Sequence, residues 1–199
     1  MWAIAINPTS GHGRGVSVGE KVVQYFSDHG LDYQVFSAHS ALELKSHLEV
    51  FLDSQNCEGV VSVGGDGLAH LILQLTVPRH IPFAIMPAGT GNDIVRTLGW
   101  SLDEIDGYLD RVTTVAAQPI DLGNVDGEWF AAILSTGFDS VVNERANSLA
   151  WPKGPQRYNV AIALELPKFR PLTYEITLDT QSFTTEAMLI AIGNGRSYG

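Results

Sequence analysis

Short apolar runs alternate with stretches of helical periodicity over the first 112 residues. Four runs are predicted as buried strands because they are short and almost wholly apolar: Trp2–Ile6, Tyr33–Phe36, Gly59–Val63 and Phe83–Met86. The segments between them place apolar residues three and four positions apart, which is typical of helices. This strand–loop–helix alternation predicts a three-layer α/β domain with a parallel sheet.

Local signals set the ends of the predicted helices. The first is expected from Val18 to a glycine cap at Gly30, and the second has Ser40 as its N-cap, with Glu43 completing a capping box. Two more helices are expected to follow the glycine-bearing loops after the third and fourth strands. A short acidic helix is expected over Leu102–Leu109.

The pattern changes after Val112. Strands are predicted over four segments: Val115–Val125, Trp129–Leu134, Leu172–Leu178 and Ser182–Ile192. The polar stretch Asp179–Gln181 is typical of a hairpin turn, and one helix is expected around Tyr158–Leu166. The change from alternating elements to mostly antiparallel strands predicts two domains, 1–115 and 116–199.

Composition and charge exclude several classes of protein. The 199 residues carry 12 Lys and Arg against 22 Asp and Glu, a net charge of −10, which argues against a nucleic-acid partner. Hydrophobic residues make up 45% of the chain, which excludes a disordered protein. The single cysteine, Cys57, forms no intrachain disulfide. No apolar run reaches the ~18–20 residues of a membrane span, and the N-terminus does not resemble a signal peptide, so a cytoplasmic protein is expected.

The loop after the first predicted strand, Asn7–Gly15, carries three glycines, two hydroxyl side chains (Thr9 and Ser10) and a cation, Arg14. Glycines at the carboxyl end of a parallel strand let the backbone approach a phosphate closely. The loop matches neither the dinucleotide fingerprint nor the P-loop. Taken alone it is equally well interpreted as a flexible surface turn.

Two further loops combine glycines with acidic residues. Gly64-Gly65-Asp66-Gly67 follows the third strand, and Gly89-Thr90-Gly91-Asn92-Asp93 lies just after the fourth. Asp66 either caps its own helix or faces a metal-bound phosphate or an attacking hydroxyl. Carboxylates around a phosphate pocket would repel the phosphates unless a divalent cation or a substrate proton offsets their charge. Phosphoryl transfer supplies both, so the two acidic loops favour that reaction. The sequence does not identify the residues that would hold the metal.

Three motifs in this order and spacing resemble the diacylglycerol kinase catalytic domain family: Asn7-Pro8-x-Ser10-Gly11, Gly64-Gly65-Asp66-Gly67 and Pro87-x-Gly89-Thr90-x-Asn92-Asp93. The resemblance extends over essentially the whole chain, through Ser135–Asp139 and Ile192–Gly195. It implies a first domain like those of phosphofructokinases and NAD kinases and a β-rich sandwich as the second, here incomplete.

The resemblance also implies an activity and a set of site residues. The protein would be an ATP- and Mg²⁺-dependent kinase acting on a lipid hydroxyl at a membrane surface. Asp66 and Asp93 match acidic positions implicated in catalysis. The positions expected to line the nucleotide site are Asn7, Thr9, Ser10, Gly11, Ser37, Gly64, Gly65, Asp66, Gly67 and Thr90.

The sequence departs from the family pattern in two places. Leu68 and Leu71 stand where the family usually has a hydroxyl and a carboxylate, and His70 is expected to have a structural partner. The family continues past a turn like Gly193–Gly199 to a late acidic general base, so the chain is expected to be truncated at its C-terminus. These departures leave open a non-catalytic nucleotide-binding fragment or pseudokinase.

The Gly-Gly-Asp-Gly loop also occurs in NAD kinases, so that function stays open, although Pro87–Asp93 favours the lipid kinases. Peripheral contact with a membrane is an option, with Trp151–Arg157 as the candidate segment. A homodimer is a further option.

Overall fold

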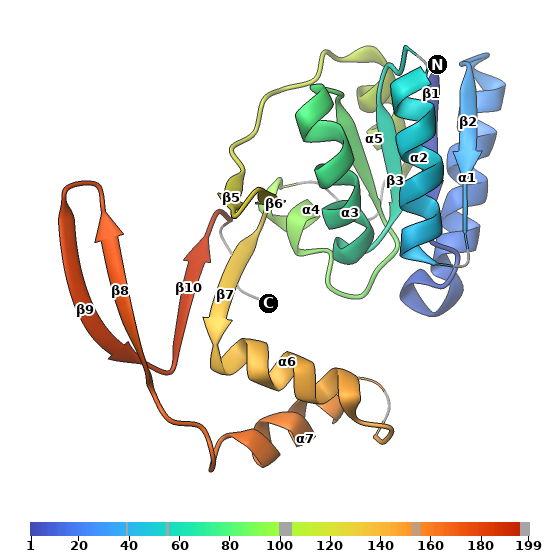
Figure 1. The fold of residues 1–199 in the computed structure, drawn as a ribbon. Coiled ribbons are helices and arrows are strands. Elements are labelled where there is room, and N and C mark those ends of the chain that lie inside the picture. The colour runs from blue at the N-terminus through green and yellow to red at the C-terminus, as the bar shows by residue number, and fades with distance from the viewer. Residues whose placement is uncertain (39, 55, 100–104, 153, 155, 196–199) are drawn as a thin grey trace. The chain divides into compact units, whose positions relative to one another are not determined.

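The computed structural model describes residues 1–38, 40–54, 56–99, 105–152, 154 and 156–195 (Figure 1). The chain divides into two units. The first contains Met1–Ala132 together with Asn194 and Gly195, and the second contains Ile133–Gly193. The predicted domain boundary after residue 115 lies before this division, because the strand pair at 123–130 belongs to the first unit.

A four-stranded parallel sheet forms the centre of the first unit. Its strands are β1 (Trp2–Ile6), β2 (Tyr33–Phe36), β3 (Val60–Gly64) and β4 (Phe83–Pro87), in the order β2-β1-β3-β4. Every neighbouring pair is parallel. The four predicted strands and the α/β fold class are therefore confirmed.

Helices follow the strands as expected, with two differences at their ends. They are α1 (Arg14–Asp28), α2 (Ala41–Ser54), α3 (Asp66–Thr76), α4 (Asp93–Thr97) and α5 (Ile105–Thr114), with single turns η1 (Ser10–Gly13) and η2 (Val77–Arg79). The α1 helix starts at Arg14 rather than Val18, because the bare backbone of Gly15 lets its first turn pack against the carbonyl of Asn7. The expected acidic helix continues to Thr114, and residues 102–104 lie outside the described part of the chain.

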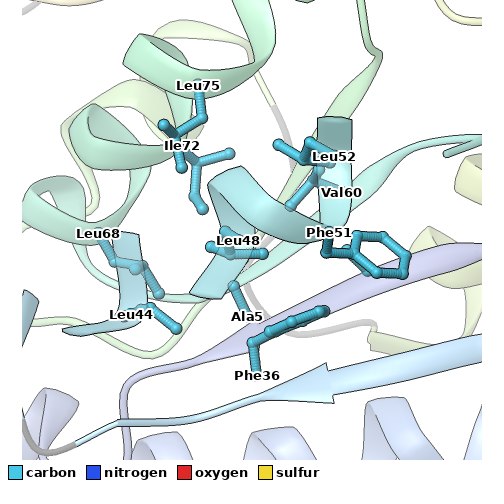
Figure 2. Packing of buried hydrophobic residues seen from close by; sticks show 11 residues of the cluster. Ala5, Phe36, Leu44, Leu48, Phe51, Leu52, Val60, Leu68, Ile72 and Leu75 are labelled. Atoms are coloured by element: carbon cyan, nitrogen blue, oxygen red, sulfur yellow. The ribbon is translucent and has the colours of Figure 1, made fainter. Parts of the chain in front are cut away.

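Strands β1, β3 and β4 are buried on both faces of the sheet, which gives the three layers. Alternate residues of a strand point to opposite faces, so Ala3 and Ala5 join one cluster while Ile4 joins the other. Figure 2 shows the first cluster, where Leu48 of α2 and Ile72 of α3 pack over the sheet. The second cluster lies under α1 and α5. The Ser40 hydroxyl accepts the backbone N–H of Glu43 at 3.2 Å, which confirms the predicted N-cap of α2.

The second unit combines two antiparallel strand pairs with two helices. Its elements are β7 (Ile133–Gly137), α6 (Phe138–Ser148), α7 (Gln156–Glu165), β8 (Leu172–Leu178), β9 (Gln181–Ala187) and β10 (Leu189–Gly193). The β7 strand pairs with β10, and β8 pairs with β9 through the predicted turn, in which Leu178 opposes Gln181. The helix expected around Tyr158–Leu166 is confirmed as α7.

Three predictions for the second half of the chain were wrong. Residues 115–122 form no strand, and only β5 (Gly123–Val125) remains of Val115–Val125; Pro119 in this segment cannot donate a ladder hydrogen bond. Trp129–Leu134 is broken into β6 (Glu128–Phe130) and β7, and Ser182–Ile192 is broken into β9 and β10. The α6 helix was not predicted, because it buries only Val142 and Ala146 and so has a weak helical pattern.

Two sets of hydrogen bonds hold the end of the first unit in place. The side-chain amide of Gln74 on α3 donates to the carbonyl of Trp129 at 2.8 Å and accepts its N–H at 2.9 Å, as a neighbouring strand would. The backbone N–H of Asn194 donates to the carbonyl of Ala132 at 2.8 Å, and its side chain donates to Ala131 at 3.0 Å. The chain therefore leaves and re-enters the first unit at one place.

Candidate active site

The three glycine-bearing loops meet at one edge of the parallel sheet. They follow β1, β3 and β4, and parallel strands bring their carboxyl ends to the same edge. The backbone N–H of Asn7 donates to Val63 at 2.9 Å, and that of Ala88 donates to Gly64 at 2.8 Å. The order of the strands thus places the loop after β3 between the other two.

Glycines allow these loops to touch through their backbones. A β-carbon added at Gly89 would lie 2.5 Å from the α-carbon of Gly65, and one added at Gly11 would overlap the carbonyl oxygen of Ala88. Gly11 also has φ of +54°, in the left-handed region that glycine adopts freely. Side chains at these positions would force the loops apart. The loop after β1 is therefore packed at Gly11 against the loop after β4.

A cavity of about 500 Å³ lies among the three loops. Five of its eleven lining residues are glycines, and the others include one carboxylate and two hydroxyl side chains. Its lining residues are Asn7, Ser10, Gly11, Ala41, Gly65, Asp66, Gly67, Leu68, Gly89, Thr90 and Gly91. The structure thus brings most of the predicted site residues together.

A second, more apolar cavity of about 270 Å³ shares Asn7, Ala41 and Leu68 with the first. Thr9, another predicted site residue, lines this second cavity, as does Leu71. The Asn7 side-chain oxygen accepts both the backbone N–H of Thr9 at 3.1 Å and its hydroxyl at 2.9 Å. These bonds fix the turn that separates β1 from η1.

Asp66 is the first residue of α3, and its side chain is directed away from its own helix. The N-cap of α3 is Gly65, and no side-chain cap bond is made there. The Asp66 Oδ1 atom instead accepts the backbone N–H of Ile94, in the first turn of α4, at 3.2 Å. Helix capping of α3 does not account for this carboxylate, which connects the loops after β3 and β4.

Asp93 lies close to Asp66 but outside the lining of both cavities. Its Oδ1 atom pairs with Nη1 of Arg96 at 3.3 Å. A β-carbon at Gly91 would lie 2.9 Å from Oδ2 of Asp66 and 3.7 Å from Oδ2 of Asp93. The two carboxylates therefore flank the same glycine.

Besides Asp93, two predicted site residues lie away from the cavity wall. Gly64 is buried in β3, where an added β-carbon would meet the side chain of Leu68. Ser37 is exposed just after β2 and lines neither cavity. The role of Ser37 at the nucleotide stays a prediction.

The residues that depart from the family pattern have structural partners. Leu68 is 7% exposed and belongs to the core cluster under α2, and Leu71 packs against the same cluster. The His70 imidazole lies 3.0 Å from the carboxylate of Glu128 on β6. His70 thus has the structural partner expected of it.

Sequence reasoning missed the part played by Asn92, which precedes α4. Its side chain is 6% exposed and bonds twice with the backbone of Gly89: Oδ1 accepts the N–H at 3.1 Å, and Nδ2 donates to the carbonyl at 2.9 Å. The only sequence signal is an asparagine that ends a glycine-rich loop, a residue type that tolerates positive φ.

The groups at this site fit a phosphate and Mg²⁺. Bare backbone and the N-terminus of α3 suit an anion. No group of three or more His, Cys, Asp or Glu side chains is arranged to hold a metal within the described ranges. This is compatible with Mg²⁺, which usually binds through one or two carboxylates together with substrate phosphates and water. Asp66 and Asp93 are the carboxylates available beside the cavity.

Comparison with known proteins identifies the family. Residues 1–125 match the model of the diacylglycerol kinase catalytic domain. The chain belongs to this family. Residues 132–199 of this chain match the YegS C-terminal NAD kinase beta sandwich-like domain. The expected β-rich second part is therefore confirmed at the level of fold class.

Curated relatives include diacylglycerol kinases from two bacteria. The Mycobacterium tuberculosis H37Rv protein is 35% identical over 97% of this chain and 64% of its own length, and the Bacillus subtilis protein is 27% identical over 98% and 65%. Sphingoid long-chain bases kinase 1 of Arabidopsis thaliana is 31% identical over 87% of this chain and 24% of its own length. This diacylglycerol kinase family chain thus spans just under two thirds of the bacterial relatives.

A solved structure supports the fold. A diacylglycerol kinase from Bacillus anthracis superposes with a TM-score of 0.71 at 23% identity, over 97% of this chain and 63% of that one. No helix in the described ranges of this family member is both long and apolar enough to cross a membrane.

Proposed function

We propose that the chain is the nucleotide-binding and catalytic part of a lipid kinase. It would transfer the γ-phosphoryl group of ATP to a hydroxyl of a lipid such as diacylglycerol, in phospholipid metabolism. The observation that carries this proposal is the cavity of glycine backbone with the carboxylate of Asp66 in its wall. The names of the bacterial relatives supply the acceptor class.

The cavity suits phosphates because it offers N–H groups without side chains. Backbone at Gly11, Gly65 and Gly89 lies close enough for three loops to contact one polyphosphate. The neighbouring apolar cavity gives the base and sugar of the nucleotide a place beside Thr9. Mg²⁺, held by Asp93 beside Asp66, would neutralise charge on the phosphate oxygens.

The transfer itself needs an acceptor for one proton. The lipid hydroxyl oxygen forms a bond to the γ-phosphorus, the bond from that phosphorus to ADP breaks, and the hydroxyl proton passes to a carboxylate. Asp66 is our candidate within this chain, since the N–H of Ile94 fixes one of its oxygens while the other lies next to Gly91.

The acceptor would be taken from a membrane surface by a cytoplasmic protein. Trp151, between α6 and α7, is 80% exposed, which suits a residue that rests in a membrane interface. Lys153 and Pro155 of this candidate segment lie outside the described residues. The net charge of −10 restricts contact with anionic lipid to a local basic area.

The variant Asp66→Asn tests the proposal. Asparagine keeps the oxygen that accepts the Ile94 N–H but loses the charge, so we expect turnover to fall at least 100-fold with ATP affinity changed by only a few fold. The measurement is ATP-dependent phosphorylation of diacylglycerol, sphingosine, ceramide and monoacylglycerol. Asp126→Asn, in the exposed turn between β5 and β6, is the matched control.

Three results would count against the proposal. Wild-type turnover in Asp66→Asn would remove that residue from catalysis. Phosphate transferred to NAD but to no lipid would make the chain an NAD kinase. ATP binding without transfer to any acceptor would leave a non-catalytic nucleotide-binding fragment.

A further inference from the structure

The side chain of Asn92 faces the loop before it rather than the helix after it. Asn92 occupies the N-cap position of α4, yet its side chain makes no cap bond to that helix. Its φ of +56° is left-handed, whereas an N-cap residue ordinarily has extended backbone. The amide is buried, and it bonds to Gly89 through both its oxygen and its nitrogen. Helix capping therefore does not explain this residue.

The two bonds close a short ring of backbone. Gly89 and Asn92 are its ends, and Thr90 and Gly91 between them line the larger cavity. The N–H of Gly89 also lies 3.2 Å from the carbonyl of Gly64, so the same end of the ring is attached to the end of β3. The asparagine amide thus holds this part of the cavity wall in a single shape.

The ring also sets the distance between the loops after β3 and β4. Gly89 packs on the backbone of Gly65. Ile94, two residues after Asn92, donates its backbone N–H to the carboxylate of Asp66. A shift of the ring would move the phosphate-facing backbone and the orientation of Asp66 together. A displacement of about 1 Å at a reacting group costs on the order of 100-fold in rate.

We infer that Asn92 is a positioning residue for the nucleotide, acting through the Gly89–Gly91 backbone without touching the substrate. The inference rests on the proposed function for its ligand, a nucleoside triphosphate. It assigns a role to a side chain that lines neither cavity.

The test compares Asn92→Gly with the wild-type full chain. Glycine adopts the left-handed backbone freely, so this change removes the two hydrogen bonds without adding strain. We expect ATP affinity, and kcat/KM for ATP, to fall 10- to 100-fold, with KM for the lipid within about twofold of wild type. A purely structural role would lower the melting temperature and leave ATP affinity unchanged.

Asn124→Gly is the matched control. The Asn124 side chain accepts the N–H of Gly127, three residues ahead, at 3.1 Å in the exposed turn between β5 and β6. This variant loses the same type of bond away from both cavities, and we expect it to retain ATP affinity. If Asn92→Gly does not fold, Asn92→Asp replaces it, since aspartate keeps the acceptor oxygen but cannot donate to Gly89.

The outcomes separate this inference from the proposed function. Wild-type ATP affinity in a folded Asn92 variant overturns the inference. An equal loss in Asn124→Gly also overturns it. ATP binding by the wild-type chain without transfer to any lipid refutes the proposed function alone, and the affinity comparison still decides the role of Asn92. No ATP binding by the wild-type chain refutes both.

Discussion

The contact between Gly89 and Gly65 predicts a large effect of one added methyl group. In Gly89→Ala the new β-carbon would lie 2.5 Å from the Gly65 α-carbon and 3.0 Å from the Asn92 side-chain oxygen. Ordinary contact begins at 3.4 Å, so the loops after β3 and β4 must separate by about 0.9 Å. Neither neighbour offers a flexible end that turns aside, because Gly65 presents backbone and the Asn92 amide is buried and bonded.

This separation has two measurable consequences. Overpacking of this kind lowers the free energy of unfolding by about 1–3 kcal/mol. Displacing the phosphate-facing backbone by nearly 1 Å should also reduce kcat/KM for ATP by on the order of 100-fold, which corresponds to about 2.7 kcal/mol of transition-state stabilisation.

The assays are urea unfolding, equilibrium ATP binding and ATP-dependent lipid phosphorylation. Gly67→Ala is the control for stability, because a β-carbon there meets nothing within 4 Å. It should unfold at or above the urea concentration that unfolds the wild type. If Gly89→Ala keeps wild-type ATP affinity and stability, the loops do not need their backbone contact, and the explanation of the glycines is wrong.

Three further changes test separate parts of the structure. Thr90→Val removes an exposed hydroxyl from the cavity wall and should weaken ATP binding, by calorimetry, with the fold intact; unchanged affinity would remove Thr90 from the site. His12→Gly relieves a left-handed φ of +59° and should stabilise the chain by about 1 kcal/mol in urea unfolding, and a loss of stability would show that the imidazole makes a needed contact. Burial raises the pKa of the Tyr108 hydroxyl in the folded chain, so the unfolded chain releases that proton at a lower pH, about 10. The contribution of this group to the free energy of unfolding is therefore complete below about pH 10 and is lost as the pH rises further. Tyr108→Phe should flatten that decline in pH-dependent unfolding, and an unaltered slope would assign it to other groups.

The position of the site could be predicted from the sequence because it depends on chain order. Apolar runs fix the strands, parallel strands end at one edge, and each glycine loop follows a strand directly. Asp66 could be placed in this way without coordinates. The contact between Asp66 and Ile94 could not, since it depends on how α4 packs across the loop.

The features that were missed depend on backbone geometry rather than on residue type. Asn92 is compatible by sequence with a helix cap, and only its positive φ turns the side chain back toward Gly89. Ser37 follows the last residue of an edge strand, where Phe36 pairs with Ala5, one residue short of the end of β1. The weak pattern of α6 and the strand-like composition of 115–122 misled the prediction in the second half of the chain.

The hydrogen bond between Asn194 and Ala132 brings together the two points at which the chain leaves the first unit and returns to it. Because the two ends are already held 2.8 Å apart, from N–H to carbonyl, a short turn between them could replace all of Ile133–Gly193 without stretching the backbone on either side. The same geometry would allow a different module to be inserted between Ala132 and Asn194, provided that its two ends lie equally close together. Such an exchange would leave the three glycine-bearing loops, which all lie in the first unit, in their present arrangement.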